Sequence, residues 1–164
     1  MTETTSKIIE KLILYFDGDV RRINHALKVL GFAGTIGQLE GLKEEELQIL
    51  EAAAVLHDIG IKQSETKYGS SAARYQEMEG PGVARELLSD LGLGDSVVER
   101  ICYLIGNHHT YGKIDGLDFQ ILVEADFLVN IFEDLMDKVQ VNSVVQKYFK
   151  TPAGTRFAAS MYKG

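Results

Sequence analysis

Apolar residues recur along the chain at the spacing of α-helices. Val20, Ile23, Leu27 and Leu30 mark one such helical face, while runs that alternate apolar and polar residues are absent from the sequence. The pattern therefore predicts an all-α fold. We expect helices over residues 5–16, 19–39, 44–58, 71–79, 81–92, 95–108, 118–136, 139–149 and 152–162.

Several predicted helix ends carry residues that start or stop helices. Asp19, Asp95 and Asp118 are predicted N-caps, and Pro81 is predicted to lie in a first helical turn. Residues 61–70 are predicted to form the longest loop, and long ordered loops often carry function.

Three glycines recur every third residue in the predicted helix 19–39: Gly31, Gly34 and Gly37. Glycine lowers helix propensity, so the pattern needs a reason. Either one face is kept small for close packing, or the helix breaks near Gly31. The sequence leaves both interpretations open.

Size and composition indicate one compact domain. The chain has 164 residues, 45% of them hydrophobic, and no repeat, low-complexity run or linker divides it. We expect a single domain over residues 1–164. The C-terminal helices could dock on the bundle or pair two chains as a homodimer, through Val141, Val144, Val145, Tyr148 and Phe149.

Charge and targeting signals limit the expected partners and the expected compartment. Seventeen basic and twenty-four acidic side chains give a net charge of −7, without a Lys/Arg block, so nucleic acid is an unexpected partner. The lone Cys102 cannot form an internal disulfide. The acidic N-terminus lacks a signal-peptide pattern, and no apolar run approaches the roughly 20 residues that span a bilayer. We expect a cytoplasmic protein without a membrane span.

Candidate chemistry begins with two carboxylates in strongly apolar helices. The helix LQILEAAAVLHDIG ends in His57 and Asp58, and FQILVEADFLVNIF carries Asp126, with Asn130 one helical turn later. A buried ionised carboxylate needs compensation. Asp126 could instead bond a buried arginine or a backbone amide, and the His-Asp pair could simply terminate a helix.

The four histidines complete the pattern. His25 lies in DVRRINHALKVL, where alone it would more often be a core residue, and His108 and His109 end ERICYLIGNHHTYG. Imidazoles and carboxylates from separate helices are the ligands that zinc, iron or manganese take in proteins. Together these residues predict a metal site more strongly than any one of them does.

The pattern resembles the HD superfamily of metal-dependent phosphohydrolases. The resemblance rests on RINHALKV around His25, AAAVLHDIG around His57 and Asp58, and LVEADFLVNI around Asp126, and it spans about residues 19–135. It implies a helical bundle in which these four residues bind a divalent metal. Where a second metal exists, Asp58 is implied to bridge the two ions.

The resemblance also implies further ligands for a second metal, at Glu79 and His109. Glu79 departs from the usual histidine, yet glutamate can ligate iron or manganese; it could equally be a solvated helix-end charge. The run His-His-Thr-x-Gly is similar to HD hydrolases that cleave dinucleoside polyphosphates. One or two ions of iron, manganese, zinc, cobalt or nickel are therefore expected.

Two further residues are candidates for direct roles on the substrate. Adjacent helical residues point about 100° apart, so His108 and His109 reach one metal together only if the helix end unwinds. We expect His109 to ligate, and His108 either to ligate or to act on the phosphate. Lys62, four residues after Asp58, is the favoured phosphate-binding lysine, although it could be an ordinary solvated loop charge.

The resulting hypothesis is a metal-dependent phosphohydrolase acting on a nucleotide or a similar small phosphate ester, with Asp58, His108 and Lys62 as catalytic candidates. Two other classes stay open. Some HD-type proteins hold two irons and oxidise their substrate with dioxygen. Others have lost metal ligands and act as interaction modules, which the presence of all four core ligands here argues against.

Overall fold

The computed structural model describes residues 1–162 as an all-α fold, without a strand in that part of the chain. The elements are α1 (Glu3–Phe16), α2 (Val20–Leu39), α3 (Glu44–Leu56), α4 (Ile61–Tyr68), α5 (Ala73–Leu88), α6 (Asp95–Ile105), the 3₁₀ turn η1 (Tyr111–Lys113), α7 (Leu117–Glu133), α8 (Lys138–Tyr148) and α9 (Pro152–Met161). The predicted fold class is confirmed.

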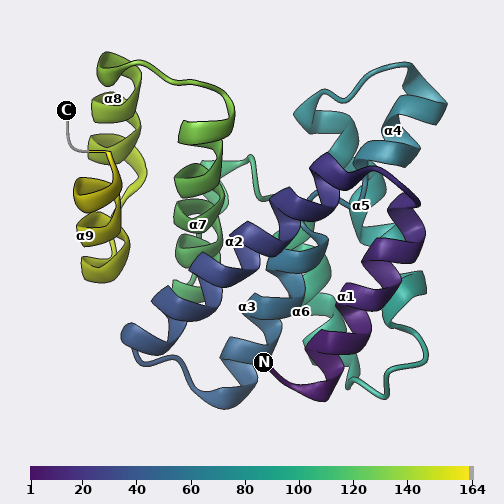
Figure 1. The fold of residues 1–164 in the computed structure, drawn as a ribbon. Helices are drawn as coiled ribbons and strands as arrows, with labels where there is room; N and C mark the ends of the chain where they lie inside the picture. The colour runs from purple at the N-terminus through teal and green to yellow at the C-terminus, as the bar shows by residue number, and fades with distance from the viewer. Residues whose placement is uncertain (163–164) are drawn as a thin grey trace.

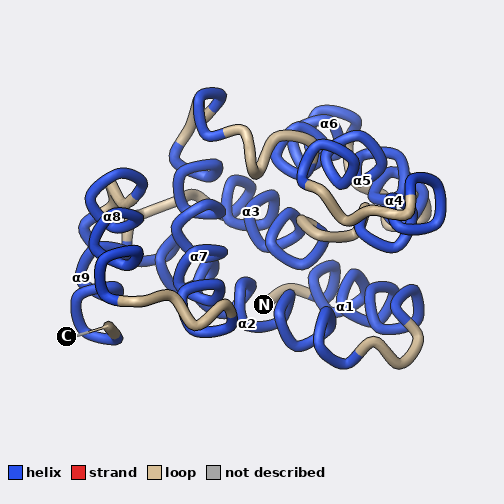
Figure 2. The backbone as a smooth tube through the Cα atoms, turned by 90° about the horizontal axis from the view of Figure 1, so that it is seen from above, coloured by secondary structure: helices blue, strands red, loops and turns tan. Residues whose placement is uncertain are grey.

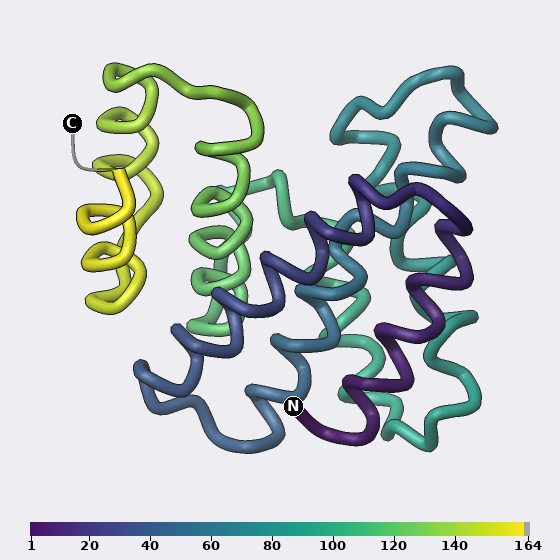
Figure 3. Tube along the Cα trace, viewed as in Figure 1, coloured from purple at the N-terminus to yellow at the C-terminus, as the bar shows by residue number. Residues whose placement is uncertain are grey.

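The bundle is organised around α3. Its last residues, from Leu50 to Leu56, are all buried, and the helix packs against α1, α2, α6 and α7. The long helix α2 crosses in front of α3 and α7 (Figure 1). Figure 3 follows the chain from α1 on one side of the molecule to α8 and α9 on the other. Seen from above, α7 stands between the α8–α9 pair and α3 (Figure 2).

The predicted loop 61–70 is wrong over most of its length, because it contains helix α4. Ile61 and Ser64 are buried on its inner side, and the helix ends at Gly69, whose φ of +62° favours glycine. The remaining residues are too polar for the hydrophobic pattern to show a helix. Packing of α4 against α5 therefore stabilises a helix that the local pattern does not show.

The break predicted at Pro81 is also wrong, because α5 runs unbroken from Ala73 to Leu88 with Pro81 inside it. Proline removes one helical hydrogen bond, so neighbouring contacts must hold the helix together. Close packing does so here: a Cβ on Gly80 would lie 2.7 Å from Ile105 Cγ2, and one on Gly106 would lie 2.9 Å from Pro81 Cγ. Tertiary packing thus overrides the helix-start signal.

Helix α2 is continuous, so the alternative of a break near Gly31 is wrong. A Cβ on Gly37 would lie 2.9 Å from Leu47 Cδ1 and 3.1 Å from Leu50 Cδ2, whereas one on Gly31 would meet nothing within 4 Å. Close approach of α2 and α3 therefore requires glycine at position 37 and leaves position 31 unexplained.

The predicted N-cap at Asp19 is confirmed, since its side chain accepts from the Arg22 backbone N–H. The N-caps predicted at Asp95 and Asp118 are wrong, because Gly94 and Gly116 take those positions. Both aspartates still lie in the first turn, where a negative charge suits the helix dipole.

The C-terminal helices dock on the bundle. Ala153, Gly154 and Ala158 are buried on α9, which packs against α7 and α2. The junction is tied by Glu124 of α7, whose carboxylate accepts from the backbone N–H groups of Lys150 and Thr151, at 2.7 and 2.9 Å. No helix in residues 1–162 is both long and apolar enough to cross a membrane.

Candidate metal centre

Chain segments far apart in the sequence bring the predicted ligands to one place. His25 comes from the second turn of α2, and Asp126 from the middle of α7. His57 and Asp58 follow directly on the buried end of α3, and His108 and His109 follow α6. His57 is 1% exposed and Asp126 9%, so titratable groups replace apolar side chains in the interior of the bundle.

The first ligand set is formed by His25, His57, Asp58 and Asp126. The Nε2 atoms of the two histidines are 3.1 Å apart, and Asp126 Oδ1 lies 3.2 and 3.5 Å from them. Asp58 Oδ2 completes the set at 3.7 and 3.6 Å from the same nitrogens. His57 Nδ1 donates to the Ala54 carbonyl at 2.8 Å, so the neutral ring presents the lone pair of Nε2 to the cluster.

The second ligand set is formed by Asp58, His108 and His109, whose donor atoms all lie within 4.8 Å of one another. His108 Nδ1 donates to the Ile105 carbonyl at 2.7 Å, and its buried Nε2 has no hydrogen-bond partner within residues 1–162. That nitrogen lies 3.5 Å from Asp58 Oδ1. A buried, unpartnered nitrogen facing a carboxylate fits a metal ligand.

Both histidines can join this set because α6 ends at Ile105, earlier than the predicted end at residue 108. Residues 106–109 form turns, which removes the angular restriction of a regular helix. Asp58 uses a different oxygen toward each set, Oδ2 toward His25 and His57 and Oδ1 toward His108. Its position between the sets agrees with the bridging role implied by the resemblance.

The titratable groups of the centre shift one another's pKa values. Burial disfavours the charged form of His25, but Asp126, Asp58 and Glu133 outweigh it and raise the pKa of His25 to about 9. Burial would raise the pKa of Asp126, but His25 and His57 hold that pKa well below its usual range. In contrast, burial and His108 lower the pKa of His109 to about 4. His109 is therefore a neutral imidazole, the form that ligates metals.

Outer contacts orient the ligands. Glu133 accepts from His25 Nδ1 at 2.9 Å and also pairs with Lys28, while Asn130 donates from Nδ2 to Asp126 Oδ1 at 2.9 Å. Such partners fix ring and carboxylate positions around a metal and contribute to its affinity.

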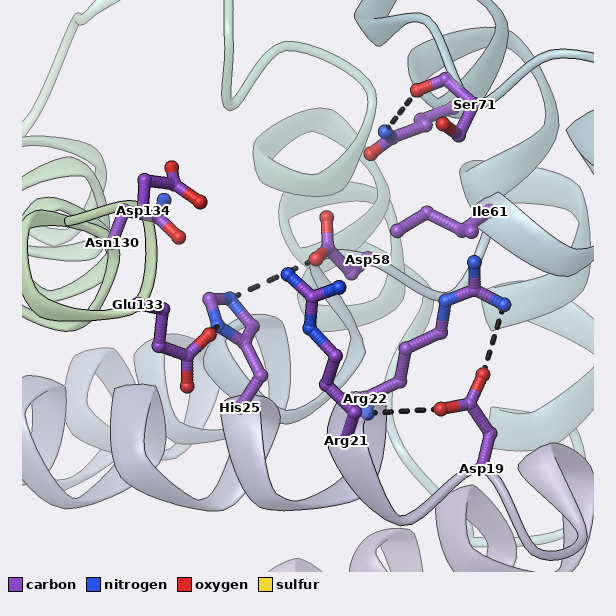
Figure 4. A pocket seen from close by; sticks show the side chains of 11 residues that line it. Asp19, Arg21, Arg22, His25, Asp58, Ile61, Ser71, Asn130, Glu133 and Asp134 are labelled. Carbon is purple, nitrogen blue, oxygen red and sulfur yellow. Dashed lines mark hydrogen bonds and ion pairs between the residues drawn. The ribbon is translucent and has the colours of Figure 1, made fainter.

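The centre opens into a cavity of about 370 Å³ (Figure 4). His25 and Asp58 lie in its wall, and α2, α4, α5, α7 and the segments between them supply the other side chains. The other lining residues are Asp19, Arg21, Arg22, Ile61, Ser71, Gln76, Asn130, Glu133 and Asp134. A small ligand can therefore reach Asp58 from solvent.

Comparison with protein families identifies the family of this chain. The family described as HD domain matches residues 22–142, a span that contains every residue of both ligand sets. The chain belongs to the HD family. Comparison with curated proteins and with solved structures gives no match. The buried His/Asp cluster of this HD domain fits divalent-metal binding.

Two predicted site residues lie elsewhere. Glu79 accepts from Lys67 Nζ at 2.6 Å and from the Tyr68 hydroxyl at 2.9 Å, so it ties α5 to α4 and is absent from the ligand sets found in residues 1–162. Lys62 donates to the Tyr15 carbonyl at 2.8 Å and lies over the Tyr15 ring. Helix α4, predicted as a loop, directs Lys62 toward α1.

Several lining residues of the cavity were not predicted as site residues, among them Arg21, Gln76 and Glu133. Arg21 precedes His25 by one helical turn, a spacing that could have revealed it in the sequence. Glu133 lies three residues, just under one turn, beyond Asn130 of α7, so the same spacing argument applies to it. Gln76 lies inside the predicted helix 71–79, but no local pattern marks it as a cavity residue.

Proposed function

We propose that this protein is a metal-dependent phosphohydrolase acting on a small phosphate ester. The observation that carries the proposal is the position of Asp58. Its two carboxylate oxygens face different histidine sets, and the residue also lies in the wall of a cavity that contains two arginines. Metal ligands and cationic side chains around one cavity suit the charges of a phosphate ester.

His25, His57, Asp58 and Asp126 would hold one divalent metal ion, and Asp58, His108 and His109 would hold a second. Bound there, a metal ion supplies a Lewis acid that lowers the pKa of water and neutralises charge on phosphoryl oxygens. The mixed nitrogen and oxygen donors suit iron, manganese, zinc, cobalt or nickel.

The protein's own groups would do the remaining work. Glu133 holds the His25 ring through Nδ1, and Asn130 holds Asp126, so both ligands keep their orientation during turnover. His108 keeps its Nε2 directed toward Asp58, where it can ligate or exchange a proton with the substrate. The chain's net charge of −7 disfavours a nucleic-acid polyanion as the substrate.

The test is metal analysis together with turnover. We expect protein purified without a histidine tag to contain transition metal and to hydrolyse p-nitrophenyl phosphate with added manganese, cobalt, iron, zinc or nickel. Asp58→Ala should lose the metal and more than about 100-fold in activity, because loss of an outer partner alone costs up to that much. Asp95→Ala, at the exposed start of α6, is the matched control and should change neither.

The outcomes separate the competing functions. Full metal occupancy in Asp58→Ala would contradict the assignment of the centre. Two irons per chain with oxygen uptake on the same substrates, and no phosphate release, would replace the hydrolase with an oxygenase. Wild-type protein that binds no metal under any of these conditions would favour a non-catalytic module.

Two further variants assign the second ligand set. We expect His109→Ala to remove one metal equivalent per chain, and His108→Ala to retain more metal while losing more turnover than substrate affinity. The reverse pattern would exchange the two roles. Unchanged metal content and turnover in both variants would leave a one-metal enzyme.

A further inference from the structure

The cavity beside Asp58 lacks the surface that a nucleobase needs. Ile61 is the single aliphatic side chain among its lining residues in the described chain, and none of them is Phe, Tyr or Trp; the aromatic ring of His25 belongs to the first ligand set. The side chains of Tyr111, Phe127 and Tyr148 contact one another instead, with Phe127 stacked on Tyr148 and Tyr111 tilted against both. Recognition of a flat, apolar base usually draws on aromatic or apolar contacts, so a nucleotide base would find little to bind here.

One wall of the cavity offers a cation for a phosphate group. Arg22 is already paired with Asp19 at 3.0 Å and Glu65 at 2.6 Å. Arg21, by contrast, lies within ion-pair distance of no carboxylate in residues 1–162 and lines the cavity. In Figure 4 its side chain extends from α2 toward Asp58. A planar guanidinium that is free beside metal ligands is suited to bind phosphate oxygens in a bidentate manner.

The opposite wall, at the end of α7, offers acceptors. Asn130 Nδ2 is used by Asp126, so the amide oxygen of Asn130 stays available. Asp134 lines the same wall and pairs with no cation in the described residues. Asp134 is exposed, so water screens its charge, and the wall selects hydrogen-bond donors more than positive charge.

We propose that the substrate is a small hydroxylated phosphomonoester, a phosphorylated polyol or sugar, whose phosphate is bound by Arg21 and whose hydroxyl groups donate to Asn130 and Asp134. The cavity volume of about 370 Å³ accommodates such a molecule. This inference rests on the proposed phosphohydrolase function and names its substrate class.

Matched pairs of esters test the substrate class. We expect kcat/KM to be at least about tenfold higher for ribose 5-phosphate than for adenosine 5′-phosphate, which adds a base. We expect a similar advantage for glycerol 3-phosphate over propyl phosphate, which lacks the hydroxyl groups. Equal or reversed ratios in both pairs, or a preference for phosphoethanolamine over glycerol 3-phosphate, would overturn the assignment.

Two variants test the contacts. Arg21→Met should raise the KM of every phosphate ester by about tenfold or more with metal content unchanged, whereas Arg156→Met, an exposed control on α9, should not. Asp134→Ala should reduce the preference for glycerol 3-phosphate over propyl phosphate and leave the KM of propyl phosphate unchanged. An unaltered KM in Arg21→Met, or an unaltered preference in Asp134→Ala, would overturn the corresponding contact.

Failure of this inference is distinguishable from failure of the proposed function. If p-nitrophenyl phosphate and nucleotides are hydrolysed but polyol and sugar phosphates without a base are not, the substrate class is wrong and the phosphohydrolase function stands. If no ester releases phosphate with any of the metals, the proposed function itself is wrong.

Discussion

Glu124 and Asp126 stand two residues apart on α7, and both are buried carboxylates in an apolar helix. Their partners differ in kind. Glu124 is held by the side-chain amide of Gln120, two backbone N–H groups and the Thr151 hydroxyl. Asp126 faces the imidazoles of His25 and His57 instead.

The comparison teaches that burial alone does not distinguish a structural carboxylate from a ligand. Residues two apart on a helix project to nearly opposite faces, so α7 directs Glu124 to the C-terminal helices and Asp126 to the centre. The donors around Glu124 keep their protons over the whole ordinary pH range. The histidines around Asp126 can give theirs up, and a neutral imidazole can accept a metal.

Replacing either carboxylate by an apolar residue gives the largest expected effect, on stability at Glu124 and on metal content at Asp126. Glu124→Leu leaves backbone donors at the α8–α9 junction unpaired and should cost about 3 kcal/mol or more in the free energy of unfolding, at about 1–3 kcal/mol for each buried group. Its metal content per folded molecule should be unchanged. Asp126→Ala should show the opposite: loss of metal, with a helical fold retained.

Urea unfolding followed by circular dichroism, and metal analysis of the folded fraction, measure both quantities. The distinction between the two residues fails if folded Glu124→Leu lacks metal, or if Asp126→Ala binds it fully.

A smaller effect is expected at the glycine that lies against Glu124. A Cβ on Gly154 would overlap Glu124 Oε2 and lie 2.8 Å from Thr151 Oγ1. Gly154→Ala should therefore destabilise the protein by about 1–3 kcal/mol, the usual cost of overpacking. Gly82→Ala is the control: it lies inside α5 with nothing within 4 Å of the added Cβ, and should stabilise by about 0.5–1 kcal/mol. A stabilised Gly154→Ala would show that the junction is loosely packed.

The sequence could predict what depends on local pattern. Helical periodicity identified the all-α fold, and the four metal-ligand candidates of the first set converge as the resemblance implied. Helix α4 and the continuity of α5 could not be predicted, because contacts between helices hold those segments in place despite polar residues and Pro81. The resemblance implies Glu79 as a ligand, and Lys62 is favoured for its short distance in sequence from Asp58, but contacts with α4 and α1 hold the two side chains elsewhere.

Helical periodicity places Glu124 and Asp126 alike in an apolar helix, and the resemblance singles out Asp126 alone. Their different roles depend on which segments pack against each face of α7, and those segments come from residues 25 and 57 on one side and 150–151 on the other. Contacts between residues so far apart in the sequence leave no trace in the hydrophobic periodicity. The fold shows the partners that give the two carboxylates these roles.

The smallest expected effect is a pH dependence that is confined to the Asp126 side. In the folded protein the pKa of His25 is raised from 6.5 to about 9, since Asp126, Asp58 and Glu133 together outweigh the burial that would lower it. The folded state therefore holds a proton that the unfolded chain releases between these values. The resulting stability is fully present below pH 6.5 and is lost as the pH rises through about 9.

For protein stripped of metal by a chelator, we expect the free energy of unfolding to fall by on the order of 2 kcal/mol between pH 6.5 and pH 9. Urea titrations at a series of pH values measure this slope. Asp126→Ala should flatten it, because the carboxylate that holds the proton on His25 is gone, whereas Gly154→Ala should keep the full slope at a lower stability. Metal affinity should rise as the pH increases from 6.5 to 9, because a metal ion must displace that proton. A wild-type slope in Asp126→Ala would mean that other groups hold the proton, and that the two carboxylates of α7 differ less in their chemistry than in their neighbours.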